Sequence, residues 1–122
     1  MTIHVRMAGV GAFHPPRVVT NKDLEQVLDT TDEWIVSHTG IRERRFVTDD
    51  LNMSDMAVAA SRQALAHAGV EGRDIELVIV ATSTPDYLMP ATAAMVAHRL
   101  GATGAAAFDM EAACSGYAYA LV

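Results

Sequence analysis

The sequence contains a single cysteine, Cys114, among its 122 residues, so no disulfide can form within the chain. That composition fits a reducing compartment better than an exported, disulfide-stabilised protein. The first residues, Met1 to Arg6, alternate apolar and polar side chains and lack the apolar core of a signal peptide. No apolar run reaches the roughly 18 residues that a membrane-spanning helix needs. We therefore expect a cytoplasmic protein that does not enter the membrane.

Basic residues are also scarce. Nine Lys and Arg stand against 15 Asp and Glu, which gives a formal net charge of −6. A nucleic-acid-binding protein usually presents a broad basic face, so we do not expect a nucleic-acid partner. The only basic cluster is Arg42, Arg44 and Arg45. It is either a small patch that meets phosphates or a solvated strand edge that includes Glu43, and the sequence leaves both interpretations open.

Hydrophobic periodicity and capping residues predict the elements of the first half. Apolar alternation predicts a strand over 3–13 that runs into a turn at Pro15-Pro16, and the segment 41–48 is also β-like. Two capping boxes predict helices: Thr20 with Asp23 opens one through Leu28, and Thr30 with Glu33 opens a second that ends at Gly40. Asn52 with Asp55 begins a longer helix that Gly69 ends.

The second half alternates short apolar strands with helices. The run Ile75–Ala81 is nearly continuous and β-branched, which predicts a parallel strand buried on both faces. A helix follows over 91–100 and stops at Gly101, and a second buried strand is expected over 105–109. This order predicts an α/β fold whose sheet is connected by right-handed crossovers.

Small residues surround Cys114 at the junction Glu111–Gly116, where the last strand gives way to a helix. A cysteine at the start of a helix lies near its positive end, which favours the reactive thiolate. The carboxyl ends of strands are where open α/β sheets place their ligands, and backbone N–H groups there can stabilise an oxyanion. A small buried hydrophobe is the alternative role of a free cysteine. Position alone does not separate the two.

Two other motifs carry less weight. Gly9-Val10-Gly11 resembles the start of a dinucleotide-binding loop, but it lacks the third glycine, and prolines follow where the helix should begin, so we reject that function. None of the histidines has metal-ligand spacing with a carboxylate or with Cys114, so we expect no metal site. Four of them are expected to be solvated or packed histidines, namely His4, His14, His67 and His98.

Three segments of the chain resemble β-ketoacyl-acyl carrier protein synthase III, a condensing enzyme of the thiolase superfamily. They are TTDEWIVSHTGIRERR at 30–45, VATSTPDYLMP at 80–90 and AFDMEAACSGYAYAL at 107–121. The resemblance implies the thiolase-like fold, a mixed sheet layered with helices in the order αβαβα. The family's chains are well over twice as long, and this chain ends eight residues after Cys114. Residues 1–122 are thus expected to be an incomplete N-terminal half, with the C-terminal half absent.

The resemblance also implies a two-step reaction. Cys114 would take a short acyl group from acyl-coenzyme A as a thioester, and malonyl-acyl carrier protein would lose carbon dioxide and attack that thioester. Covalent catalysis of this kind divides one difficult transfer into two easier ones. The catalytic His and Asn that act on the malonyl thioester are expected in the absent C-terminal half. The family resemblance further implies a homodimer that starts fatty-acid or polyketide chains and holds no permanently bound cofactor.

Four further site residues follow from the resemblance alone. Trp34 matches the tryptophan that stacks on the adenine of coenzyme A, with a role as a helix anchor as the alternative. Thr30 matches a residue near the phosphates, and helix capping explains it equally well. His38 stands where many relatives have Arg, which weakens one expected phosphate contact, since histidine is mostly neutral at pH 7. Met89 matches a position that reaches into the partner subunit's acyl pocket, and plain core packing is the alternative.

Two other functions remain open. A relative that keeps the cysteine could transfer the acyl group to an alcohol or amine without condensation, and the presence of His plus Asn in the remaining half would separate these reactions. The other candidate is a non-catalytic subunit of the same fold. An intact junction around Cys114 argues against it, because an inactive site has no need of a helix-terminal thiol.

Overall fold

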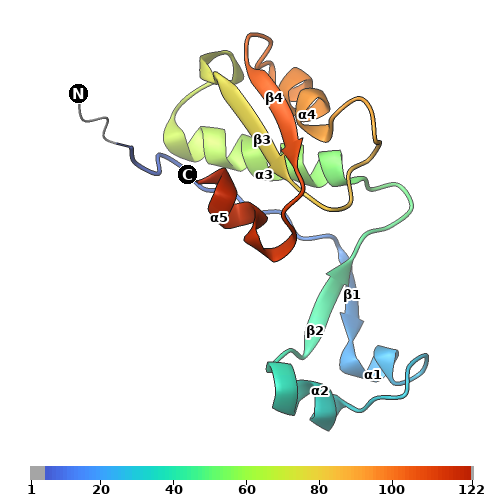
Figure 1. Ribbon diagram of the computed structural model, residues 1–122. Coiled ribbons are helices and arrows are strands. Elements are labelled where there is room, and N and C mark those ends of the chain that lie inside the picture. Colours follow the sequence, from blue (N-terminus) through green and yellow to red (C-terminus); the bar gives the residue numbers. More distant parts are fainter. Residues whose placement is uncertain (1–4, 122) are drawn as a thin grey trace. The chain divides into compact units, whose positions relative to one another are not determined.

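The computed structural model describes residues 5–121, which form two compact units (Figure 1). The larger unit comprises residues 5–13 and 52–121, and the smaller unit comprises residues 14–51. We describe each unit by itself.

The smaller unit is built on a two-stranded antiparallel sheet, β1 (Arg17–Thr20) and β2 (Glu43–Phe46), with the helices α1 (Asn21–Leu24) and α2 (Asp32–Thr39) between them in the chain. Asn21 is its polar centre and is only 1% exposed. Its Nδ2 donates to the Asp32 carboxylate at 2.7 Å and to the Ile41 carbonyl at 2.9 Å. Arg44 donates to its Oδ1 at 2.6 Å. A buried amide whose donors and acceptor are all used ties the start of α1 to the start of α2 and to β2.

Of the two predicted capping boxes in this unit, one is confirmed and one is wrong by a residue. Thr20 and Asp23 cap α1 reciprocally, although the helix ends at Leu24 rather than Leu28. The N-cap of α2 is Thr31, whose Oγ1 accepts from the Trp34 N–H at 3.1 Å. The expected box from Thr30 to Glu33 is therefore absent. The predicted end of α2 is confirmed, since Gly40 adopts the left-handed conformation with φ 72°.

The larger unit contains two parallel strands, β3 (Leu77–Ala81) and β4 (Ala106–Met110), which confirms the predicted parallel pairing. The long helix α3 (Met53–Ala68) and the helix α4 (Thr92–Leu100) pack with them, and their ends at Gly69 and Gly101 are as predicted. The short turn η1 (Gly72–Asp74) precedes β3. The hydrophobic core lies between the strands and these two helices, and its buried members are Val58, Val80, Ala93 and Val96.

Two sequence predictions for this unit are wrong. Leu77 of β3 is 48% exposed and Phe108 of β4 is 44% exposed, so neither predicted strand is buried on both faces. Residues 5–13 form no strand, because Gly9 and Gly11 lie directly against the backbone of α3. A Cβ at Gly9 would come within 2.3 Å of the Ala64 carbonyl oxygen, and one at Gly11 within 2.1 Å of the Ala60 oxygen. These glycines therefore allow the segment to pack closely on α3. His4 lies outside the described residues.

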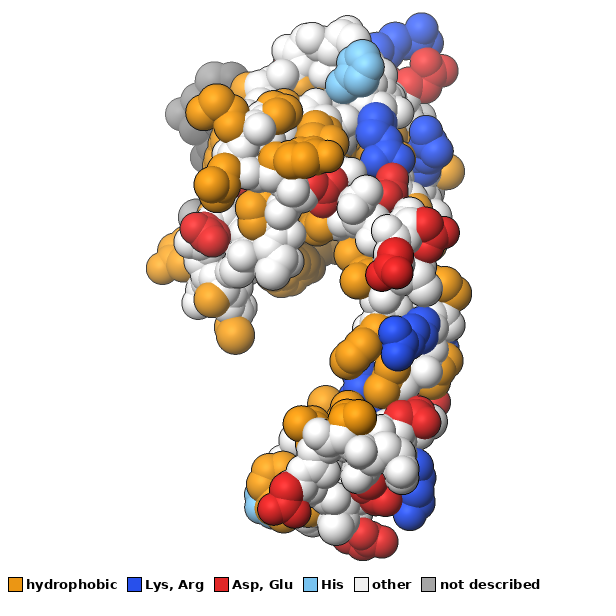
Figure 2. Space-filling view, turned by 90° about the vertical axis from the view of Figure 1, so that its right-hand side faces the viewer, with side chains coloured by type: hydrophobic (Ala, Val, Ile, Leu, Met, Phe, Trp, Pro, Cys, Tyr) orange, Lys and Arg blue, Asp and Glu red, His pale blue; other side chains and the backbone are white. Residues whose placement is uncertain are grey.

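Large hydrophobic side chains remain on the surface. Figure 2 shows several of them standing out from one face of the larger unit. In β3, β4 and the chain after β4, the exposed ones are Leu77, Phe108, Tyr117, Tyr119 and Leu121. Within residues 5–121, no helix is both long and apolar enough to cross a membrane.

Candidate functional site

Cys114 lies in a tight turn that follows β4, as the sequence predicts. The strand ends at Met110, the 3-10 turn η2 (Ala113–Ser115) carries the cysteine, and α5 (Gly116–Ala120) begins directly after it. Cys114 is a free, exposed thiol, so the alternative of a buried hydrophobe is wrong. The cysteine precedes the α-helix rather than occupying its first residue.

The backbone immediately before Cys114 is strained. Ala113 has φ 43°, the only positive φ at a residue other than glycine in the described part of the chain. The left-handed region costs an L-residue roughly 1–2 kcal/mol, so the surrounding contacts must hold the turn in place. One of these contacts is the hydrogen bond from the Ser115 N–H to the Ala112 carbonyl at 3.0 Å. The turn reverses the chain so that the thiol is presented to solvent.

Close packing on β3 fixes the other side of the turn. Gly116 is buried, and a Cβ added to it would come within 3.0 Å of the Ala81 Cβ at the end of β3. Thr82, the next residue, donates its N–H to the Met110 carbonyl at 3.1 Å. The carboxyl ends of both strands therefore support the segment that holds Cys114, which is the position at which open α/β sheets place reactive groups.

Asp109, near the end of β4, connects the strand to α4. Its two carboxylate oxygens accept hydrogen bonds from the backbone N–H groups of Thr92 and Ala93, both at 2.7 Å. Thr92 and Ala93 are fully buried. The carboxylate thus takes the place of an N-cap side chain, since Ala91 at the N-cap position has none to offer.

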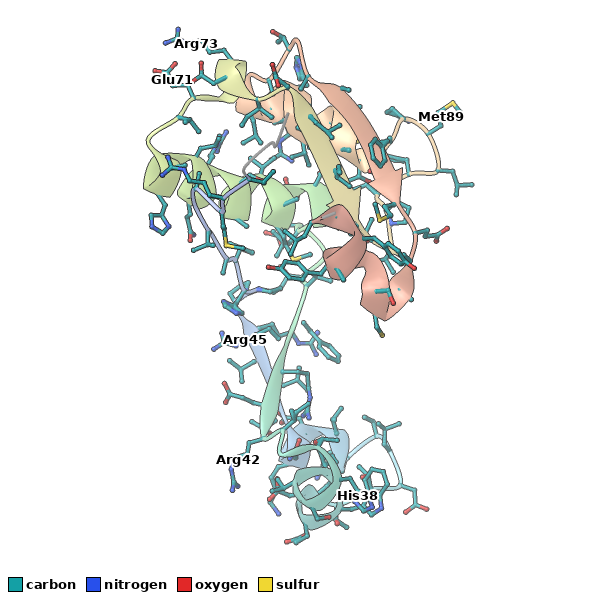
Figure 3. All side chains as sticks on the ribbon, turned by 60° about the vertical axis from the view of Figure 1, so that its left-hand side comes forward. His38, Arg42, Arg45, Glu71, Arg73 and Met89 are labelled. Atoms are coloured by element: carbon teal, nitrogen blue, oxygen red, sulfur yellow. The ribbon has the colours of Figure 1, made fainter. Side chains whose placement is uncertain are left out.

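The loop between β3 and α4 is anchored at its base and exposed at its tip. The Asp86 carboxylate accepts from the Ser54 N–H at the start of α3, at 3.2 and 3.3 Å, and the Asp86 N–H donates to Thr92 Oγ1 at 3.3 Å. Leu88 and Met89 follow, with 100% and 86% of their surface exposed. Figure 3 shows Met89 projecting outward from this loop. Core packing as the role of Met89 is therefore wrong for this chain.

A second group of predicted site residues lies in the smaller unit, on and before α2. Trp34 is 57% exposed, so it is not a buried helix anchor. The ring of His38, one turn later, stacks on the indole with centroids 4.4 Å apart and an interplanar angle of 23°. The His38 Nδ1 lies 2.8 Å from the Trp34 carbonyl oxygen.

Thr30 lies beside Trp34. A pocket of about 220 Å³ is lined by Asp29, Thr30, Thr31 and Trp34. The Thr30 Oγ1 is buried and has no hydrogen-bond partner among the described residues. Because Thr31 caps the helix, capping does not explain Thr30. A buried hydroxyl without a partner calls for a functional explanation, such as a bound ligand or water.

The arginine cluster divides between internal and surface roles. Arg44 is used inside the smaller unit through Asn21 and the Val19 carbonyl. Arg45 pairs with Glu43 at 3.7 Å, as expected of a strand edge. Figure 3 shows Arg42 projecting away from the rest of its unit. These partners favour the strand-edge interpretation over a single phosphate patch.

Hydrogen bonds lower the pKa of two aspartates in this fold. The Asn52 N–H and then Arg99, whose guanidinium lies 2.8 Å from the carboxylate, hold the pKa of Asp55 below its usual range. The hydroxyl and the N–H of Thr20 do the same to the pKa of Asp23. Both aspartates are structural caps.

Among residues 5–121, no three His, Cys, Asp or Glu side chains gather closely enough to hold a metal ion.

The predicted site residues thus form two groups, with Thr30, Trp34 and His38 in the smaller unit and Met89 and Cys114 in the larger one. Sequence reasoning missed three residues that shape them: Ala113, Asp86 and Asp109. Asp86 and Asp109 each accept hydrogen bonds from the start of a helix that lies earlier in the chain, so no local capping pattern signals them. Nothing in an alanine signals a left-handed turn.

Known proteins similar to this chain in sequence and in structure are described as synthases of the same kind. The chain is 51% identical over 121 residues to beta-ketoacyl-[acyl-carrier-protein] synthase III of Rhodospirillum centenum, covering 99% of this chain and 38% of that protein. Among solved structures, the priming beta-ketosynthase of the R1128 polyketide pathway superimposes with a TM-score of 0.92 at 46% identity, over 95% of this chain and 35% of that one. The 3-oxoacyl-[acyl-carrier-protein] synthase III of Aquifex aeolicus gives 0.90 at 45% identity, over 93% and 37%. No family model matches the chain.

Proposed function

Because the chain is homologous to the N-terminal part of the beta-ketoacyl-[acyl-carrier-protein] synthase III enzymes and has their thiolase-type fold, we propose that it supplies the acyl-accepting cysteine of such a condensing enzyme. The chain spans about 38% of the length of the curated relative described above. The observation that carries the proposal is the exposed Cys114 thiol on a strained turn at the carboxyl ends of β3 and β4.

In the first step, the Cys114 thiolate attacks the thioester carbonyl of a short acyl-coenzyme A. The tetrahedral intermediate collapses, the new sulfur–acyl bond remains on Cys114, and coenzyme A leaves as its thiolate, which takes up a proton. The strained turn favours this step because it fixes the sulfur before substrate arrives, so that little ordering is left to be done in the transition state. Exposure of the thiol gives a bulky thioester access to it.

In the second step, malonyl-acyl carrier protein loses carbon dioxide, and the resulting carbanion attacks the acyl-Cys114 thioester. The β-ketoacyl chain leaves on the carrier protein, and the Cys114 thiolate is restored. We propose that a His and an Asn stabilise the developing enolate, and that they come from the part of such an enzyme that this chain does not match in its relatives. Transfer without condensation uses the same first step and differs only in the second.

Coenzyme A binding is assigned to the group on α2. The exposed indole of Trp34 offers a flat face to the adenine, and base–aromatic stacking contributes roughly 1–3 kcal/mol per base. The unpartnered Thr30 hydroxyl in the adjacent pocket is available to a phosphate or ribose oxygen. No group in this scheme has to be permanently bound, since coenzyme A enters and leaves as substrate.

Acylation of Cys114 tests the proposal directly. The full-length protein, incubated with acetyl- or a short branched acyl-coenzyme A, should gain one acyl mass per subunit on the peptide that contains Cys114. Cys114→Ala should abolish the gain, and Ser115→Ala, a change at the next residue of the same turn, serves as the matched control that keeps it. Labelling of another residue, or acylation of the Cys114→Ala protein, would refute the assignment. Addition of malonyl-acyl carrier protein then separates condensation from simple transfer.

Met89 is assigned to the acyl pocket of a partner subunit in a homodimer. Its exposure on an anchored loop supports the role, because a side chain free of its own core is available to another surface. Met89→Ala should shift the primer preference toward longer or branched acyl groups, measured as the ratio of kcat/KM values for acetyl- and isobutyryl-coenzyme A. Leu88→Ala is the neighbouring control. An unchanged ratio at unchanged stability would remove Met89 from the site.

A further inference from the structure

His38 occupies one face of Trp34. The two rings are stacked at 4.4 Å, close to the spacing of two aromatic rings in van der Waals contact, and both residues belong to α2 at the i, i+4 spacing that brings side chains together. A flat base can therefore stack only on the other face of the indole, unless it displaces the imidazole.

Hydrogen bonds hold the imidazole in that position. A carbonyl oxygen can only accept, so the Nδ1 that lies 2.8 Å from the Trp34 oxygen is the donor. Ser37 Oγ lies 3.1 Å from the same Nδ1 and donates to the same carbonyl at 2.9 Å. With Nδ1–H committed to the backbone, only the Nε2 of His38 remains available to a ligand.

We infer that His38 is a positioning residue that orients the Trp34 indole for base stacking, rather than a residue that holds a phosphate of the ligand. The inference rests on the proposed coenzyme A site and deepens it. An exposed tryptophan has several rotamers open to it, and binding a base would have to select one of them. A ring stacked on the indole and fixed through Nδ1 makes that selection before the ligand arrives, which lowers the ordering cost of binding.

A double-mutant cycle tests this role, with dissociation constants for coenzyme A measured by calorimetry on the full-length protein. Trp34→Ala should weaken binding by roughly 5- to 150-fold, the loss expected for one stacked base. His38→Ala should weaken it by roughly 3- to 10-fold, within the range of coupling between residues in contact. In the Trp34→Ala background, His38→Ala should have almost no further effect, because the residue that it positions is gone.

The conservative variant and a shortened ligand sharpen the cycle. His38→Phe keeps a flat ring on the indole and should retain most of the affinity. The loss in His38→Ala should be equal for coenzyme A and for 3′-dephospho-coenzyme A. Equal losses in both backgrounds would overturn the positioning role, because they would show that His38 acts independently of Trp34. A loss seen only with the 3′-phosphate present would show instead that His38 binds that phosphate. Tighter binding by His38→Ala would show that the imidazole competes with the base.

A spectroscopic readout separates failure of this inference from failure of the proposed function. Trp34 is the only tryptophan of the 122 residues, and the difference in near-ultraviolet circular dichroism between the parent and Trp34→Phe isolates its signal. That signal should fall sharply in His38→Ala and persist in His38→Phe. An unchanged signal in His38→Ala would overturn the positioning role, even if Cys114 is acylated as proposed. Loss of the signal without any acylation of Cys114 would instead refute the proposed function alone.

Discussion

Ala113 has a strained backbone conformation that the sequence does not predict. A left-handed turn normally takes glycine, and this one places an alanine at φ 43° immediately before Cys114, the proposed nucleophile. Glycine would adopt this conformation without strain, so the surroundings of Ala113 must maintain it. We propose that the strained turn serves to orient Cys114. From the sequence, the small residues around Cys114 predict a tight turn, but they do not say which residue is strained.

Ala113→Gly tests that orientation. Relief of the left-handed conformation should raise the free energy of unfolding by up to about 1 kcal/mol, less the added entropy of glycine in the unfolded chain. The same change should slow acylation of Cys114, because the thiol is no longer held in one position. Thermal unfolding and single-turnover acylation give the two values. Ala112→Gly, whose φ of −136° is ordinary, is the control. Faster acylation by Ala113→Gly would contradict the argument.

The neighbouring threonines show how local signals fail by one residue. Thr30 and Thr31 are both good N-caps, and the sequence offers a Glu at the position that would complete a box with Thr30. The structure uses Thr31 instead, with Asp32 engaged by Asn21 and Glu25. This long-range network decides the register of α2, and no local pattern contains it. The shift leaves the Thr30 hydroxyl free to face the pocket beside Trp34.

At the scale of elements, the ends of the helices follow from the sequence more closely than the strands do. Gly40, Gly69 and Gly101 all end helices in the left-handed conformation, because glycine alone adopts it without cost. Of the strand predicted over 3–13, the described residues 5–13 form none, and Gly9 and Gly11 lie against α3 instead of beside another strand. Alternating apolar and polar residues indicate an extended segment with two different faces, but they do not show which element of the fold packs against it.

Asp109 should be a strong determinant of stability in the larger unit. Asp109→Ala leaves two fully buried N–H groups of α4 without acceptors, at roughly 1–3 kcal/mol each. We expect a loss of about 2–4 kcal/mol in the free energy of unfolding, measured with urea. Asp74→Ala, which removes a comparable but exposed cap from the Glu71 N–H, should cost well under half of that. Similar losses in both variants would show that burial of the α4 cap is unimportant.

Asp55 should make the fold sensitive to acid. Its hydrogen bonds with the Asn52 N–H and Arg99 hold its pKa in the folded state below the unfolded value, which is near 3.9. The unfolded chain then binds the proton more readily, so the stabilisation is complete above about pH 4 and is lost as the pH falls through the folded pKa. Asp55→Asn should flatten the decline in stability between about pH 4 and 2. A decline as steep as that of the parent would assign acid sensitivity to other groups.

At the scale of the whole chain, the larger unit exposes apolar side chains and unpaired strand edges. Leu77, Phe108 and Tyr117 are 48%, 44% and 69% exposed around the two strands of the larger unit. In residues 5–121, β3 and β4 pair only with each other, so each has an unpaired edge. Parallel strands are found almost only in sheets covered on both faces, and unpaired edges promote association. Relatives with the same fold are more than twice as long as this chain, so more polypeptide is available there to cover such surfaces.

Residues 1–122 expressed alone should therefore associate rather than behave as a stable monomer. The exposed apolar side chains should bind a hydrophobic dye strongly, and thermal unfolding should lack a cooperative transition with a concentration-independent midpoint.

Leu77→Thr together with Phe108→Thr should reduce dye binding and association if these side chains drive the association. Val27→Thr, at a side chain that is 75% exposed in the smaller unit, is the control that should change little. Size-exclusion chromatography with light scattering gives the mass. A monomer that unfolds cooperatively would show that β3, β4 and their helices form a complete folding unit, and that the exposed Leu77 and Phe108 need no cover.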